Sequence, residues 1–468
     1  MNPKTLISLD GAVIANPQRR LPAPISFELR QGECIAIVGA NGSGKSTLVE
    51  MIRGGFYLRE GALRFALGDE SYRSIRVVEF DNAYSTTEVQ YYYQQRWQAF
   101  EREASPLAGE LLGEADGLWR ERLFNLLNIK PLLEKEIITL SSGELRRFSI
   151  ARALLQRPEV LILESPFIGL DPPTRQALCD LLQQLLDELG LSIIMTLTDV
   201  SRIPPVATHV YLMDGGRISA KMTAAEARAA GSSAKPAASK AVTLPSLHAT
   251  PRFDTIVEMR HIDISYGERQ IFRDLNWKVH SGEKWNVTGP NGSGKSTLLS
   301  LVNADNPRAY SLDITLFDRR RGTGESIWDI KRHIGYLSSE MHSSFRENLK
   351  ALDIVRDGLE GRLGDGSPAA EDDYLLGWMR LFGAEHLASR DYLTLSSGEQ
   401  RYILLIRAFV KDPDLLILDE PFQGLDPALR HRAAGIIEAF CERENKTLIF
   451  VTHYIEEIPG IVTNTLQL

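Results

Sequence analysis

The sequence predicts an α/β fold that occurs twice in tandem, with a helical subdomain inserted into each copy. A set of three motifs appears twice in the same order, which indicates a duplicated domain. Short apolar runs such as CIAIVG (34–39) and LLILDEP (415–421) are typical of buried parallel strands, and each is followed by a helical stretch. The segments at about 85–138 and 340–393 lack strand patterning, so they predict the helical insertions.

Length and composition are those of a globular protein with two or three domains. The chain has 468 residues, of which 43% are apolar and 24% are charged. Its net charge of -8 gives no overall attraction to nucleic acid or to anionic lipid. The dense basic run at 319–321 is read as a solvated loop, with a nucleic-acid contact as the minor alternative, so we expect no nucleic-acid partner.

The cysteines and the apolar segments bear on location. Cys34, Cys179 and Cys441 lie far apart and show no metal-ligand spacing, so we expect reduced thiols in a cytoplasmic protein. The first residues, MNPKTLISLD, lack a basic region followed by an apolar core, and no window of about 18 apolar residues occurs. If the protein drives transport, another chain supplies the channel and this one lies at the cytoplasmic face of the membrane.

The repeated motifs keep their spacing, which defines two domains at 1–220 and 254–468. The first motif repeats at an offset of 250 residues and the other two at an offset of 255. The pairs are GANGSGKST and GPNGSGKST (39–47, 289–297), LSSGELRR and LSSGEQRY (140–147, 395–402), and LILESPFIGLDP and LILDEPFQGLDP (161–172, 416–427).

Residues 221–253, between the domains, are predicted to be a linker. They are rich in Ala, Ser and Pro and have no apolar periodicity. One short helix is expected at the start, since Thr223 and Glu226 form a capping-box pattern and Gly231 supplies a stop.

The first motif of each copy is a phosphate loop, G-x-x-x-x-G-K-[ST] after an apolar strand. Its main-chain N–H groups surround phosphate oxygens, and the following helix directs its positive end at them. Lys45 and Lys295 would neutralise phosphate charge, and Ser46 and Ser296 would ligate Mg²⁺. A loop of this kind binds ATP or GTP. The remaining ATP-binding candidates are Gly39, Asn41, Gly42, Gly44, Thr47, Gly289, Asn291, Gly292, Gly294 and Thr297.

Two further motifs separate ATP from GTP. The pattern L-S-x-G-[EQ] at a helix start, followed by an apolar strand that ends in Asp-Glu, resembles the ATP-binding-cassette family over nearly the whole chain. Such a helix start can bind an anion through its N–H groups and its dipole. The resemblance implies that it contacts the γ-phosphate of ATP held by the opposite domain; the residues are Ser141, Gly143, Ser396 and Gly398.

The same resemblance assigns a complete catalytic set to the second domain. Asp419 would hold Mg²⁺ through water, and Glu420 would orient or deprotonate the attacking water. His453 matches the family's switch histidine, and Tyr266 matches the aromatic residue that stacks on adenine. The alternative readings are a structural histidine and a core tyrosine.

The first domain departs from this pattern. Glu164 can still reach a hydrated Mg²⁺, but Ser165 cannot accept a proton at neutral pH. We therefore expect a Mg²⁺-dependent ATPase with one turnover site and one slow site that binds ATP less tightly. The first-domain counterparts of Asp419, Glu420, His453 and Tyr266 are Glu164, Ser165, Thr198 and Asn16.

The resemblance also implies an arrangement of the two domains. Cassettes of this family close head to tail, and each ATP lies between one phosphate loop and the opposite LSSGE helix. An intramolecular cassette dimer with two composite sites is therefore expected. The family usually carries Gln after a strand such as IGYVP, where it relays to a membrane partner; Ser339 stands there instead, and the first domain offers VVEFDN without a glutamine.

Several biological roles remain open. The leading interpretation is an ATPase that drives import or export through separate transmembrane subunits. The stretch 311–339 is most like a tandem-cassette group associated by name with molybdate uptake, although no residue here implies molybdate. The alternative is a soluble regulatory ATPase without a channel. In the first insertion Tyr93, Trp97 and Phe100 fall on one helical face, which predicts either packing on the sheet or a docking surface.

Overall fold

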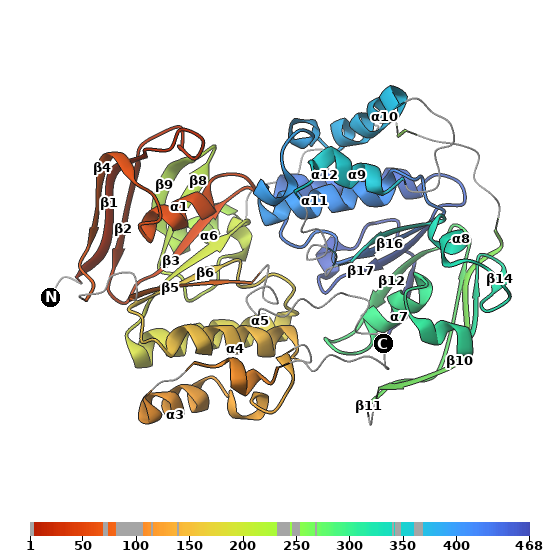
Figure 1. The fold of residues 1–468 in the computed structure, drawn as a ribbon, viewed down its shortest axis with the longest axis horizontal. Helices are drawn as coiled ribbons and strands as arrows, with labels where there is room; N and C mark the ends of the chain where they lie inside the picture. The colour runs from red at the N-terminus through yellow and green to blue at the C-terminus, as the bar shows by residue number, and fades with distance from the viewer. Residues whose placement is uncertain are drawn as a thin grey trace. The chain divides into compact units, whose positions relative to one another are not determined.

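The computed structural model describes residues 4–68, 74–80, 106–113, 116–137, 140–231, 244–245, 253–266, 269–338, 341, 348–359 and 368–468. They form two compact units. The first unit contains most of the first copy of the repeat, and the second unit contains most of the second copy. In Figure 1 the first unit runs from red to yellow-green and the second from green to blue.

The first unit combines two sheets with helices. Its strands are β1 (Thr5–Ile14), β2 (Ile25–Arg30), β3 (Cys34–Gly39), β4 (Leu58–Phe65), β5 (Ile75–Glu79), β6 (Val160–Glu164), β7 (Ser192–Leu197), β8 (His209–Asp214) and β9 (Arg217–Thr223). Its α-helices are α1 (Lys45–Ile52), α3 (Gly117–Leu126), α4 (Ser142–Leu154), α5 (Pro172–Leu189) and α6 (Ala224–Gly231).

The second unit repeats this plan. Its strands are β10 (Thr255–Tyr266), β11 (Arg269–His280), β12 (Lys284–Thr288), β13 (Asp313–Leu316), β14 (Arg319–Arg320), β15 (Ile334–Leu337), β16 (Leu415–Asp419), β17 (Thr447–Val451) and β18 (Asn464–Gln467). Its α-helices are α7 (Lys295–Val302), α8 (Ile327–Lys331), α9 (Ala351–Asp357), α10 (Pro368–Leu381), α11 (Ser397–Phe409) and α12 (Pro427–Cys441).

Each unit has one mainly parallel sheet and one antiparallel sheet. In the first unit the larger sheet has the order β5-β6-β7-β3-β8-β9, in which only β9 is antiparallel to its neighbour. In the second unit β15-β16-β17-β12-β18 is parallel throughout. The predicted α/β class and the predicted parallel strands are confirmed. The strands that precede both phosphate loops therefore end at the same edge as β6 and β16, which carry the acidic residues.

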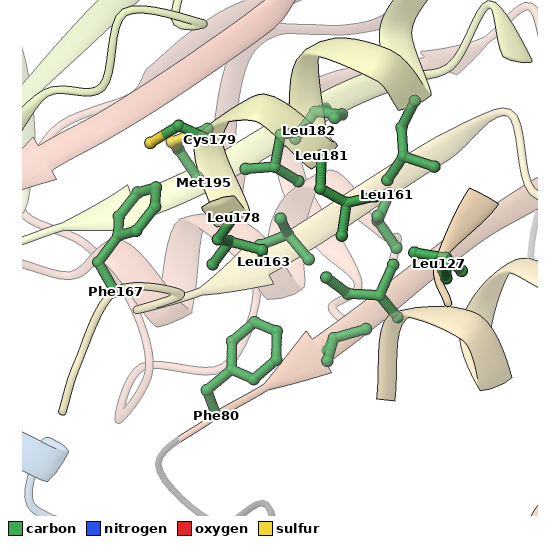
Figure 2. Packing of buried hydrophobic residues seen from close by; sticks show 14 of the residues in the cluster. Phe80, Leu127, Leu161, Leu163, Phe167, Leu178, Cys179, Leu181, Leu182 and Met195 are labelled. Atoms are coloured by element: carbon green, nitrogen blue, oxygen red, sulfur yellow. The ribbon is translucent and has the colours of Figure 1, made fainter. Parts of the chain in front are cut away.

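Both faces of the larger sheet are buried, which explains why its strands read as continuous apolar runs. In β3, Ile35 and Ile37 pack with α1 and the antiparallel sheet. Cys34, Ala36 and Val38 pack on the opposite face, with α4 and α5. Figure 2 shows this second side, where leucines of α5 lie over Leu161 and Leu163 of β6. Helix α1 is thus held between two sheets at the end of the phosphate loop.

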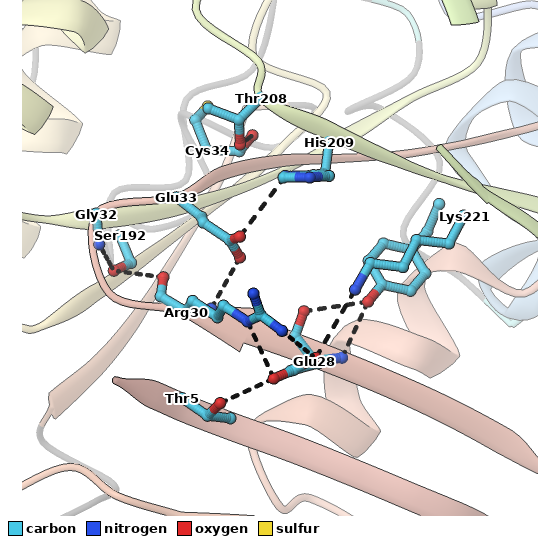
Figure 3. A network of polar contacts seen from close by, with 11 residues as sticks. Thr5, Glu28, Arg30, Gly32, Glu33, Cys34, Ser192, Thr208, His209 and Lys221 are labelled. Carbon is cyan, nitrogen blue, oxygen red and sulfur yellow. Dashed lines mark hydrogen bonds and ion pairs between the residues drawn. The ribbon is translucent and has the colours of Figure 1, made fainter. Parts of the chain in front are cut away.

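Polar contacts join the two sheets of the first unit, as Figure 3 shows around Glu28 of β2. The main-chain N–H of Glu28 donates to the Tyr211 hydroxyl of β8, and that hydroxyl donates back to the Glu28 carbonyl, both at 3.1 Å. The Glu28 carboxylate accepts hydrogen bonds from Arg30 and Thr5, and the Arg30 bond is the largest cause of its lowered pKa. These contacts fix β2 relative to β8.

The described parts of the predicted insertions are helical. They contain α3 in the first unit and α9 and α10 in the second, together with short 3-10 turns. Tyr93, Trp97 and Phe100 lie outside the described residues, so neither reading of that face is tested.

The domain boundary predicted at residue 220 is too early. It falls inside β9, and the following helix α6 packs into the first unit through Ala224 and Ala227. The predicted capping box is present, because the Thr223 N–H donates to a Glu226 carboxylate oxygen at 2.9 Å. Alanine-rich composition suggested a linker, but two small side chains on one face are enough to dock this helix.

The three cysteines are free and buried. Burial raises the pKa of the Cys441 thiol to about 12 and also raises the pKa of Cys34 and Cys179. Within the described ranges, no helix combines the length and apolar character needed to cross a bilayer.

Candidate nucleotide-binding sites

The two phosphate loops have the same backbone design. Gly44 and Gly294 cap α1 and α7 with φ of 94° and 104°, which side chains rarely adopt. A Cβ on Gly294 would also come within 2.6 Å of Ile271 Cγ2. These glycines therefore let each helix begin at the lysine. The other predicted loop residues lie at the strand end, in the turn or in the first helical turn: Gly39, Asn41, Gly42, Thr47, Gly289, Asn291, Gly292 and Thr297.

Each lysine ammonium is held at its own loop. Lys45 Nζ donates to the Gly39 and Ala40 carbonyls, both at 2.8 Å. Lys295 Nζ donates to the Gly289 carbonyl at 2.7 Å and to the Pro290 carbonyl at 3.0 Å. The charge is thus placed where the main-chain N–H groups of the loop would meet a phosphate.

The predicted Mg²⁺ ligands of the first unit meet in space. Ser46 Oγ donates a hydrogen bond to Glu164 Oε2 at 3.0 Å, although 118 residues separate them. In the second unit Ser296 is exposed at the start of α7, and Asp419 ends β16 at the same edge of the sheet. Hydroxyl and carboxylate oxygens suit Mg²⁺, so the residues of both units fit this ion.

Glu420 lies directly after β16 and is 8% exposed. Its Oε1 is buried, and no group in the described part of the chain donates a hydrogen bond to it. The pKa of Glu420 is raised to about 8. Burial is the largest cause, and the neighbouring Asp419 and Glu457 carboxylates come next. A carboxylate that titrates this close to neutral pH suits proton acceptance from water.

The histidine predicted to be the switch histidine lies beside this carboxylate. His453, which follows β17, has its Nε2 3.7 Å from Glu420 Oε1. The edge of the parallel sheet brings the two together because β16 and β17 are neighbours. In the first unit Thr198 follows β7 at the corresponding place, and Ser165 follows β6. That unit therefore has the same framework without the carboxylate or the imidazole.

The two LSSGE helices begin with matching capping boxes. Ser141 Oγ accepts from the Glu144 N–H at 3.3 Å, and the Glu144 carboxylate accepts from the Ser141 N–H at 2.9 Å. Ser396 and Glu399 form the same pair, with the Ser396 N–H to carboxylate distance at 2.8 Å. These bonds fix the N-termini of α4 and α11. Gly143 and Gly398 lie in the first turns of these helices.

Tyr266, the predicted adenine platform, ends β10 and is partly buried. Its hydroxyl accepts from Asn306 Nδ2 at 3.3 Å, and the Arg308 guanidinium lies 4.6 Å from the ring centre. One face of the ring is thus covered by a cation. Asn16, its first-unit counterpart, is exposed, and its side chain accepts from the Gln18 N–H at 3.0 Å.

Two buried arginines were missed in the sequence. Arg146 Nε donates to the Pro166 carbonyl at 2.8 Å, and Arg401 Nη2 donates to the Glu420 carbonyl at 3.3 Å. Each comes from an LSSGE helix and supports the loop after β6 or β16. Both follow the LSSGE glutamate by two residues, so the repeat itself contained the signal.

Phe80 is a second residue that the sequence did not single out. Strand pairing aligns Ile75 with Val160 and Ile334 with Leu415, which places Phe80 at the position of Ser339. Phe80 is buried, as Figure 2 shows for the core beside β6. The Arg146 guanidinium lies 5.3 Å from its ring centre. Ser339 itself lies outside the described residues.

Comparison with known proteins shows the family to which the chain belongs. The sequence pattern of the ABC transporter family matches residues 23–168 and 272–423. The chain is 32% identical to the Escherichia coli ABC transporter ATP-binding protein ModF, over 98% of this chain and 96% of that protein. It is 29% identical to an uncharacterised ABC transporter ATP-binding protein of Schizosaccharomyces pombe, C323.04, over 94% of this chain and 92% of the relative.

Solved structures support the fold. A model of ribosome-bound archaeal Pelota and ABCE1 matches 95% of this chain and 72% of its own, with a TM-score of 0.61 and 20% identity. A structure titled RNase-L Inhibitor matches 98% of this chain and 87% of its own, with a TM-score of 0.54 and 19% identity. The chain belongs to the ABC transporter family and carries two of its ATP-binding domains in tandem.

Proposed function

We propose that the chain is a Mg²⁺-dependent ATPase that hydrolyses ATP mainly at the site of the second unit. The contrast at one backbone position supports this most strongly. Glu420 there is a buried carboxylate 3.7 Å from His453, whereas the first unit has Ser165. Loss of a positioned proton acceptor costs about 10²–10⁴ in rate. The first site binds ATP and turns it over slowly.

Each residue has a defined part in the reaction. Lys295 places a positive charge at the β- and γ-phosphates, and Ser296 with Asp419 holds Mg²⁺. Bound Mg²⁺ neutralises charge on the phosphate oxygens. Glu420 accepts the proton of the attacking water, and the His453 imidazole is the polar group beside that carboxylate. In the first unit Lys45, Ser46 and Glu164 retain the binding half of this set.

Steady-state ATPase measurements on the purified chain test the assignment. Glu420→Gln, which keeps the shape of the side chain, should reduce the rate by about 10²–10⁴. Ser165→Glu should leave most of the rate unchanged, because the first unit also has Thr198 where His453 stands. Glu456→Gln is a suitable control, since Glu456 is an exposed carboxylate near His453 in sequence. Near wild-type turnover in Glu420→Gln would exclude the second site as the main site.

The family resemblance further suggests that each ATP is completed by the LSSGE helix of the other domain. Under this proposal Ser141 and Gly143 complete the turnover site, and Ser396 and Gly398 complete the slow site. Ser141→Ala should then lower turnover more than Ser396→Ala does. Equal effects, or the reverse order, would argue against the head-to-tail arrangement.

The proposed cellular role is that of a cytoplasmic energy-coupling subunit bound to separate transmembrane proteins. Similarity to ABC transporter ATP-binding proteins supports it. Molybdate has no support among the described residues, so no solute is proposed. Cell fractionation tests the role: the chain should sediment with membranes and be released by an alkaline carbonate wash.

A regulatory ATPase without a membrane partner is the second candidate, and Phe80 favours it. This apolar, buried residue stands at the position where the family resemblance expects a glutamine that relays to the membrane subunit. The regulatory role predicts that the chain stays in the supernatant of the fractionation. It also predicts full ATPase activity of the purified chain without any membrane protein.

A further inference from the structure

In the second unit, residues that follow the phosphate-loop helix surround Tyr266, the predicted adenine platform. The segment that follows α7 reaches the end of β10, where Asn306 binds the Tyr266 hydroxyl and Arg308 covers one ring face. Arg308 Nη1 also donates to the Ser265 carbonyl at 2.7 Å, which ties the segment to the residue before the tyrosine. A ring, a cation and a main-chain anchor thus occur together.

The first unit has the corresponding segment in the corresponding place. Gly54 and Ala304 lie at the 250-residue offset, and both have positive φ, 81° and 60°. Beyond Gly54 the chain turns back to the end of β1, where the Ala15 N–H donates to the Tyr57 carbonyl at 2.9 Å. Ala15 immediately precedes Asn16, the counterpart of Tyr266. Tyr57 therefore lies beside the position that lacks an aromatic side chain.

A guanidinium is present at this place too, although it comes from another part of the chain. Arg20 Nη2 donates to the Ala15 carbonyl at 3.0 Å, and its Nε donates to the Ile14 carbonyl at 3.1 Å. Ala15 corresponds to Ser265, so both units bind an arginine to the same carbonyl. The loop that carries Arg20 also lies close to the phosphate loop. Leu21 Cδ2, in the next residue, is 3.0 Å from the place that a Cβ on Gly44 would occupy.

The Tyr57 side chain is open to a ligand. It is 92% exposed, whereas Tyr266 is partly buried beneath Arg308. We propose that Tyr57 is the nucleobase-stacking residue of the first site, in place of the aromatic residue missing at position 16. The stacking ring of the first site would then stand in the segment before β4 rather than at the end of β1, with Arg20 as the nearby cation. This inference rests on the proposed binding of ATP by the first unit.

Stacking has a consequence for specificity. Every nucleobase has a π-face, so stacking on an exposed ring tolerates different bases, and loss of the ring weakens binding by about 5- to 150-fold. We expect Tyr57→Ala to weaken ATP binding at the first site by about tenfold or more, within that range. Tyr57→Phe, which keeps the ring, should bind as the parent does. GTP should bind the first site about as well as ATP.

Isothermal titration calorimetry on the full chain tests the proposal in a Lys295→Ala background. This substitution removes the positive charge that would bind the phosphates of ATP at the second site. ATP is titrated into this parent, Tyr57→Ala, Tyr57→Phe and the control Leu118→Ala, which truncates another exposed side chain of the same unit (85% exposed). Inorganic tripolyphosphate is titrated in parallel. It has no base, so its affinity should be the same in all four proteins.

The outcomes separate this inference from the function on which it rests. Weaker ATP binding in Tyr57→Ala alone, with unchanged tripolyphosphate binding, supports the stacking role. Unchanged ATP binding in Tyr57→Ala overturns it, while loss of binding in a Lys45→Ala variant of the same background would still uphold ATP binding by the first unit. No ATP binding by the Lys295→Ala parent would refute the first site and this inference together.

Discussion

Glu420 and Ser165 occupy the same backbone position in the two units, with left-handed φ of 50° and 52°. The main-chain N–H of each is held by the neighbouring strand: Glu420 donates to the Val451 carbonyl at 2.9 Å, and Ser165 donates to Thr196 Oγ1 at 3.1 Å. The first unit thus retains the strained turn at the edge of the sheet where the phosphate loop also lies, although the carboxylate is absent.

Replacement of the histidine beside Glu420 should slow turnover. His453→Ala removes the imidazole 3.7 Å from the carboxylate, so the ATPase rate should fall about tenfold or more. His261→Ala is the control, because the His261 side chain is 79% exposed and pairs with Asp274 in the β10–β11 hairpin. Equal rates for His453→Ala and the parent would remove His453 from the reaction.

The two phosphate-loop lysines should be separable by stoichiometry. Equilibrium dialysis should give two bound ATP per chain for the wild type and one for either Lys45→Ala or Lys295→Ala, because each ammonium serves its own loop. Only Lys295→Ala should also abolish most turnover. Lys130→Ala, at an exposed lysine paired with Glu121, should change neither quantity. One ATP per wild-type chain would contradict the account.

The raised pKa of Glu420 should appear in the stability of the nucleotide-free protein. Between the ordinary value of 4.5 and about 8, the native carboxyl keeps a proton that the unfolded chain has released. Stability from this group is therefore full below pH 4.5 and is lost as the pH rises through 8. In EDTA, the Tm of Glu420→Gln should rise relative to that of the wild type over this interval.

Glu385→Gln provides the opposite case. The Glu385 carboxylate pairs with Arg380, which lowers its pKa, so it loses no native contact as the pH rises. Its Tm relative to the wild type should not rise over the same interval. A Tm difference for Glu420→Gln that does not change with pH would show that Glu420 is ionised in the native state at all these pH values.

The sequence predicted the parts of each site that are local or repeated. The phosphate loops, the LSSGE helices and the strands before Asp419 and His453 follow from short motifs whose spacing recurs. Two residues whose places depend on strand pairing were missed. Phe80 corresponds to Ser339 only once β5 is paired with β6, and Tyr57 reaches Ala15 only because β4 pairs with β1. Neither fact is encoded in a local pattern.

The thiols offer a test of packing. Burial raises the pKa of Cys441 to about 12 and raises the pKa of Cys34, so neither forms a reactive thiolate at neutral pH. Ellman's reagent should react slowly with the native protein. After unfolding in guanidinium chloride it should react rapidly with all three cysteines. Rapid native reaction of more than one thiol would be incompatible with the cores described for both units.

The most direct test of the central claim is to find which half retains the nucleotide after turnover. The chain is incubated with Mg²⁺ and a radiolabelled photoreactive ATP, trapped with vanadate during hydrolysis, crosslinked, and cut at a protease site introduced within 232–243. The account predicts trapped ADP on the second half, with loss of trapping in Glu420→Gln. Equal trapping on both halves, or trapping on the first half, would contradict a single turnover site.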